Sequence, residues 1–210
     1  MGGFGAVRLR VVPHATGSPR SPLTRERIRL AGRAEVERVG VDALSLRAVA
    51  RSLGVTAAAL YRHVGSKREL VETIAAAAFE ELAERFAAVD VDDPLDRLRA
   101  QSRAYVDHAL ASPEIYRVMM RFPPEIDGVT SAFAPATQVF EAAIGSVADA
   151  LAAGQLAPAD PLIIGLTMWA AVHGVVETLL LGFDLPPDVA AALVDSVIES
   201  VIAGLVAGRD

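Results

Sequence analysis

Residues 44 to 70, LSLRAVARSLGVTAAALYRHVGSKREL, contain two short apolar patterns of helical period on either side of a glycine. The first has apolar residues at i, i+3, i+4 and i+7 after Ser45, a natural N-cap: Leu46, Val49, Ala50 and Leu53. The second repeats this spacing after Thr56, with Ala57, Leu60, Tyr61 and Val64. Gly54 can take the positive φ that a sharp turn requires. The pattern predicts a helix-turn-helix, whose second helix lies in the DNA major groove.

The outer face of the second helix has the chemistry expected of a DNA contact. Small alanines at its start allow close approach to base edges and thymine methyl groups, and cationic or polar groups around them suit phosphate. We expect these residues near bases: Ser45, Arg47, Thr56, Ala57 and Ala58. We expect these toward phosphate: Arg25, Tyr61, Arg62, His63 and Lys67. Ser66 and Glu69 form a capping box that opens the next helix, in which Leu70 faces inward.

The same stretch resembles the DNA-binding domain of the TetR family of bacterial transcriptional regulators. The shared features stand in order, without gaps: Ser45-Leu46-Arg47, Val49-Ala50, Leu53-Gly54-Val55-Thr56, Leu60-Tyr61-Arg62-His63-Val64, Ser66-Lys67 and Leu70. Glu35 departs from the family, in which many members have a hydrophobic residue. A shorter stretch, Trp169 to Gly174, resembles a signature of one subset of TetR C-terminal domains. Without the resemblance, a helical hairpin with a solvated basic face would explain the periodicity as well.

Charge is distributed unevenly along the chain. The net charge is −6, which argues against a nucleic-acid partner for the chain as a whole. Residues 1 to 75, however, contain 13 Arg or Lys against 6 Asp or Glu, whereas residues 76 to 210 contain 7 against 20. A basic head on an acidic body is expected where only the head meets DNA.

The whole chain predicts an all-α fold of about nine helices, because strand-like alternation is scarce. We divide it into a flexible basic arm (1–23), a three-helix DNA-binding head (24–70) and a larger body for effector binding and dimerisation (71–210). Gly32 lies inside the first helix, where we expect another helix to cross closely. Residues 66–88 should link head to body, and the acidic break 89–94 follows. Two helices should follow this break, one from about Pro94 to Ala111 and one from Pro113 to just before Pro123. A third should start at Thr130 or Ala134.

The arm has two interpretations: a disordered tail, or a basic segment that reaches along DNA. No secretory signal is visible in it. The longest apolar stretch, Pro161 to Leu181, includes His173 and Glu177, so we interpret it as a core helix rather than a membrane span. The expected location is the cytoplasm.

Aromatic and polar residues of the body suggest a small-molecule cavity among the helices after residue 94. The candidates are Tyr105, His108, Tyr116, Met119, Phe122, Phe140, Trp169 and His173. The alternative is that these side chains are ordinary core. His173 and Glu177 stand at i and i+4 and could simply pair. We expect no metal site, because the histidines do not cluster in the sequence.

The resemblance implies a homodimer formed by the last two helices, which would present two recognition helices to a roughly palindromic operator. The function we expect is a ligand-responsive transcriptional repressor, released from DNA by a small, mainly apolar effector. An activator of the same family, and a helical ligand-binding protein that has lost DNA binding, stay open. Enzyme motifs are missing, and we expect neither catalysis nor a cofactor.

Overall fold

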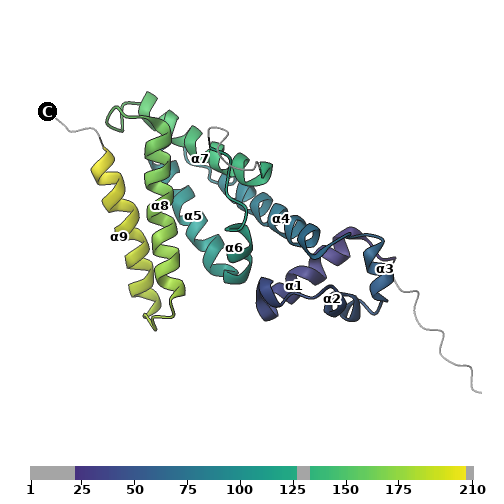
Figure 1. Cartoon of the computed structure of the whole chain (residues 1–210). Coiled ribbons are helices and arrows are strands. Elements are labelled where there is room, and N and C mark those ends of the chain that lie inside the picture. The colour runs from purple at the N-terminus through teal and green to yellow at the C-terminus, as the bar shows by residue number, and fades with distance from the viewer. Residues whose placement is uncertain (1–21, 127–132, 207–210) are drawn as a thin grey trace, which may run out of the picture.

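The computed structural model describes residues 22–126 and 133–206, and there the fold is all-α, as the sequence predicted (Figure 1). Most of the predicted arm, and the alternative helix start at Thr130, lie outside the described residues. The described helices are α1 (Arg25–Ala43), α2 (Leu46–Ser52), α3 (Ala57–Tyr61), α4 (Lys67–Ala87), α5 (Pro94–Ala111), α6 (Pro113–Met119), α7 (Ala134–Ala152), α8 (Pro161–Leu180) and α9 (Pro187–Leu205).

Short side chains cap three helices of the head and its linker. Thr24 Oγ1 accepts from the Arg27 N–H at 3.2 Å, and Thr56 Oγ1 accepts from the Ala59 N–H at 3.1 Å. The cap predicted at Ser45 is wrong in one respect, because its hydroxyl forms no capping hydrogen bond. The backbone of Ser45 still has the extended conformation of an N-cap, with φ −128° and ψ 122°.

The turn between α2 and α3 forms at Gly54, whose φ is +67°. Leu60 and Val64, which follow the turn, are buried in the core of the head. Tyr61 belongs to the same apolar pattern in the sequence, but its side chain is 52% exposed. Helix α3, the predicted recognition helix, therefore packs on the head through Leu60 and exposes the side that bears Tyr61.

Helix α4 is the long element that connects the head to the body (Figure 1). Ser66 Oγ accepts from the Glu69 N–H at 3.1 Å, and the Glu69 carboxylate accepts from the Gly65 N–H at 2.7 Å. The capping box is thus closed one residue earlier than in its usual form. The predicted close crossing is confirmed: a Cβ at Gly32 would lie 2.9 Å from Leu70 Cδ2. Glycine at position 32 lets α1 and α4 approach.

The body is a bundle in which α5 contacts α4, α7, α8 and α9. The short helix α6 packs against α1 of the head as well as α4. Helices α8 and α9 lie side by side at the end of the body away from the head (Figure 1). One continuous apolar core runs from Ile28 in the head to Ile202 in α9.

Helix α8 is long and apolar enough to cross a membrane, judged by length and composition alone. Here it packs against α5, α7 and α9, as a core helix does. Only 33% of its apolar window is buried within the single chain, however. The prediction of a buried helix therefore holds for one face, and much of the remainder lies at the protomer surface.

Candidate functional site

The residues predicted to contact DNA lie on the surface of α1 to α3 and the start of α4. Seven of them are exposed: Arg25, Ser45, Arg47, Thr56, Ala58, Tyr61 and Arg62. The other three, Ala57, His63 and Lys67, are half-buried. None of the ten belongs to the buried core of the head. Their roles at bases or phosphates stay predictions.

Cations of the head fall into two groups. Arg29, Arg33 and Arg38 of α1 form ion pairs with nearby carboxylates. In contrast, Arg47 and Arg62, beside the recognition helix, form no ion pair with any residue that the structure describes. An exposed guanidinium without a carboxylate partner retains its full attraction for phosphate. The unpaired positive charge of the head thus includes two guanidiniums next to α3.

Lys67 has a structural contact in addition to its predicted role. Its Nζ donates to the backbone carbonyl of Asp42 at 2.7 Å, which ties the first turn of α4 to the end of α1. The Asp42 carboxylate accepts from Arg121, beyond α6, at 2.7 Å. The guanidinium of Arg121 lowers the pKa of Asp42. Asp42 therefore connects the head, α4 and the segment after α6.

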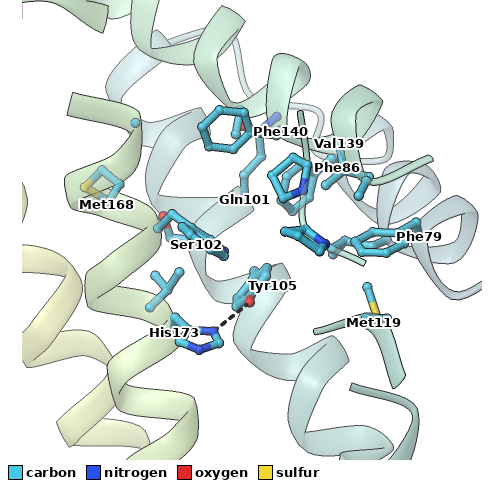
Figure 2. Close-up of a pocket in the computed structure, with 18 of the residues that line it drawn as sticks. Phe79, Phe86, Gln101, Ser102, Tyr105, Met119, Val139, Phe140, Met168 and His173 are labelled. Atoms are coloured by element: carbon cyan, nitrogen blue, oxygen red, sulfur yellow. Dashed lines mark hydrogen bonds between the residues drawn. The ribbon is translucent and has the colours of Figure 1, made fainter. Parts of the chain in front are cut away.

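A cavity of about 230 Å³ lies in the body between α4, α5, α6, α7 and α8 (Figure 2). Its wall is mainly apolar, and Phe79, Leu82 and Phe86 of α4 form one side. Phe140 of α7 and Trp169 of α8 meet edge to face, with ring centroids 6.5 Å apart. An apolar cavity with a few polar groups is the usual form of a small-molecule site.

One end of the cavity has a hydrogen-bonding cluster of Tyr105, Tyr116 and His173. Tyr116 Oη lies 2.6 Å from His173 Nδ1. Tyr105 Oη lies 3.5 Å from the same nitrogen, and this contact is dashed in Figure 2. Burial raises the pKa of Tyr105 to about 12 and also raises the pKa of Tyr116. Both phenols are therefore protonated at neutral pH. The sequence left open that His173 pairs with Glu177. Among the described residues its hydrogen-bond partner at 2.6 Å is Tyr116 instead.

Six of the eight predicted ligand residues line this cavity: Tyr105, Met119, Phe122, Phe140, Trp169 and His173. Tyr116 lies behind His173, and it is not part of the wall. His108 is not in the wall either, and it is buried near Ala78 of α4. Burial, followed by the charge of Arg85, lowers the pKa of His108. Contact of these residues with an effector stays a prediction.

Sequence reasoning missed two polar wall residues, Gln101 and Ser102 of α5. A signal for them exists, because Leu98, Gln101, Ser102 and Tyr105 follow the helical spacing i, i+3, i+4 and i+7. An amide and a hydroxyl that interrupt an otherwise apolar stripe indicate a buried polar group with a task. The α4 side of the wall was missed as well, because α4 was interpreted as a linker.

Two patterns of known families match the chain. The pattern described as "Bacterial regulatory proteins, tetR family" matches residues 28–74, which cover most of α1 and all of α2 and α3. The pattern described as "Tetracyclin repressor-like, C-terminal domain" matches residues 98–201. Together they span the surface around α3 and most of the cavity wall.

Individual proteins give the same result. The HTH-type transcriptional regulator Rv1816 of Mycobacterium tuberculosis is 30% identical over 127 residues, or 59% of this chain. The match spans only about half, 53%, of that relative's length.

Solved structures also resemble the chain. A protein of unknown function from Rhodococcus sp. RHA1 has a TM-score of 0.77 at 27% identity, covering 93% of this chain and 99% of that one. A TetR variant from Acinetobacter baumannii, in complex with minocycline, has a TM-score of 0.64 at 23% identity. There the match covers 87% of this chain and 96% of the other, and it shows a shared fold.

Proposed function

The chain belongs to the TetR family of bacterial transcriptional regulators, and we propose that it is a ligand-responsive repressor that binds a palindromic operator as a homodimer. The family is one of regulators rather than enzymes, and its DNA-binding members act where the chromosome is, in the cytoplasm. The observation that carries the proposal is the path of α4. Its first residue, Lys67, is hydrogen-bonded to Asp42 of α1 in the head, and its Phe79, Leu82 and Phe86 line the cavity.

DNA binding is assigned to the head. Two-fold symmetry would place two α3 helices in successive major grooves, about 34–36 Å apart. Ser45, Arg47, Thr56, Ala57 and Ala58 would then face bases. Arg25, Tyr61, Arg62, His63 and Lys67 would face phosphate. The unpaired guanidiniums beside α3 support this assignment, because phosphate contacts supply most of the affinity.

Dimerisation is assigned to α8 and α9, and residues 71–210 form the effector-binding and dimerisation domain. Exposed apolar side chains gather near the junction of these helices: Leu181, Phe183 and Val189. Two thirds of the residues in the apolar window of α8 are half-buried or exposed in the single chain. Such a surface favours burial against a second copy.

The effector is assigned to the cavity, and its binding would be coupled to the head through α4 and α6. Helix α6 contacts α1, and Met119 at its end lines the cavity. An effector that fits better when α4 and α6 have moved would favour a state in which the two heads no longer match the operator. Equal affinity for both states would change nothing.

The test is binding of the purified protein to the DNA upstream of its own gene at two salt concentrations. We expect specific binding that weakens steeply with salt. The variant Arg62→Met should weaken binding, whereas Arg85→Met, which removes an exposed cation further along α4, should not. Specific binding absent there but found by selection from random DNA would place the operator elsewhere. No DNA binding at all would refute the regulator and favour a ligand carrier.

A further inference from the structure

The cavity described above has a wall that selects against charge. Among its lining residues there is no Asp, Glu, Lys or Arg. The wall includes one imidazole, that of His173, and its Nδ1 is hydrogen-bonded to Tyr116. A charged ligand would lose its hydration here without gaining an opposite charge, which is costly in an apolar surrounding.

The polar groups of the wall differ in whether they have partners. Ser102 Oγ donates to the Leu98 carbonyl at 2.8 Å. Tyr105 lies near His173, as described. The exception is Gln101, whose side chain is 7% exposed and whose Oε1 has no hydrogen-bond partner among the described residues. Buried polar atoms in proteins are nearly always paired, so an unpaired one in a cavity indicates a group supplied from outside.

The position of Gln101 fits that purpose. It lies one turn of α5 before Tyr105, so the amide stands apart from the cluster at His173. Figure 2 shows Gln101 in a part of the wall formed by Phe86, Val139 and Phe140. An apolar molecule that fills this part would cover the amide completely. Without a hydrogen-bonding group of its own, it would leave the Gln101 oxygen unpaired as in the free protein, whereas a donor on the ligand would add a hydrogen bond.

We propose that the effector is an uncharged, mainly apolar molecule with a hydroxyl or N–H group that donates a hydrogen bond to Gln101. This inference rests on the proposed function, because it names the class of molecule to which the regulator responds. The cavity of about 230 Å³ is smaller than most drug-binding sites, so the molecule is small. Gln101 is the residue that distinguishes an alcohol from a hydrocarbon of the same shape.

The experiment uses the full chain and four matched probes: n-octanol, n-octane, octanoate and octylammonium. Trp169 is the only tryptophan of the chain and lines the cavity, so its fluorescence reports occupancy directly. Thermal stabilisation gives a second readout. We expect n-octanol to bind about tenfold or more tightly than the other three probes, because it alone is uncharged and satisfies the amide.

The variant Gln101→Leu keeps the approximate shape and removes the amide. It should lower n-octanol affinity about tenfold and leave n-octane affinity equal or higher. The control Gln138→Leu changes an exposed glutamine of α7 outside the cavity wall, and it should change neither affinity. The unliganded melting temperature of Gln101→Leu should not fall, because the replaced oxygen has no partner to lose.

Three results would overturn the proposal: tighter binding of octanoate or octylammonium, no binding of n-octanol, or an unchanged n-octanol affinity in Gln101→Leu. Each is independent of the DNA experiment. Specific operator binding together with a preference for a charged probe would leave the regulator in place and refute the effector class. A preference for n-octanol without any DNA binding would refute the regulator and support the proposed class of ligand.

Discussion

The crossing of α1 and α4 at Gly32 allows a stability prediction with an internal reference. Two helical glycines, Gly32 and Gly145, are each changed to alanine. Alanine in a helix interior is about 1 kcal/mol more favourable than glycine. At Gly145 a new Cβ would meet nothing within 4 Å, so the full gain is expected.

At Gly32 the same gain is opposed by a clash. The new Cβ would lie 2.9 Å from Cδ2, 3.0 Å from Cδ1 and 3.1 Å from Cγ of Leu70. Because Cγ is nearly as close as the methyl groups, rotation of Leu70 about χ2, which moves only the methyl groups, does not relieve the contact. Leu70 is fully buried, so the two helices must separate. Overpacking of this kind costs about 1–3 kcal/mol, which leaves Gly32→Ala between neutral and about 2 kcal/mol less stable.

Thermal unfolding followed by far-ultraviolet circular dichroism measures both variants. We expect Gly145→Ala to melt about 2–4 °C above the parent protein. Gly32→Ala should melt at the parent temperature or up to about 8 °C below it. A Gly32→Ala protein as stable as Gly145→Ala would refute the argument, because it would mean that α1 and α4 separate at no cost.

Three further predictions concern single side chains. Lys67→Met should weaken binding to all DNA sequences alike and reduce the salt slope by about 1; unchanged affinity in gel-shift titrations would remove Lys67 from the interface. Tyr116→Phe loses the 2.6 Å bond to His173 and should lower the free energy of unfolding by about 1 kcal/mol in a urea titration, whereas Tyr61→Phe, at an exposed position, should be neutral in the same titration. His108 has a folded pKa below 6.5, so the unfolded chain binds its proton first and stability should fall as pH drops below that value. Melting temperatures across this range should decline less in His108→Gln, and an equal decline would exclude His108 as a cause.

Local signals explain why the head was predictable. A hydroxyl cap, a turn glycine and an apolar stripe lie within one or two helical turns of each other, so sequence alone contains them. The predicted hairpin at residues 44 to 70 was confirmed as α2 and α3 on that basis. Ser45 stands at the N-cap as predicted but forms no capping hydrogen bond, because the orientation of the side chain, which residue type does not determine, decides whether that bond forms.

The cavity wall depends on packing between helices that are distant in the sequence, so fewer of its residues could be predicted. Aromatic residues of the body suggested a cavity, since large side chains are hard to pack without gaps. Whether a residue lines the space or supports it is decided by neighbours: His108 faces α4, and Tyr116 is screened by His173. Gln101 escaped notice because its burial depends on helices far along the chain.

The cavity has two kinds of wall, and this affects how such a protein could be redesigned. Phe86 and Met119 belong to α4 and α6, which touch the head, so changing them alters recognition and response together. Val139, Phe140 and Met168 belong to α7 and α8, whose main contacts are within the body. A library diversified only at these three positions would search for new inducers while it preserves the transmission to DNA. A biosensor built on this scaffold would therefore gain new specificities from α7 and α8 alone, whereas changes to the wall residues of α4 and α6 would alter its dynamic range together with its specificity.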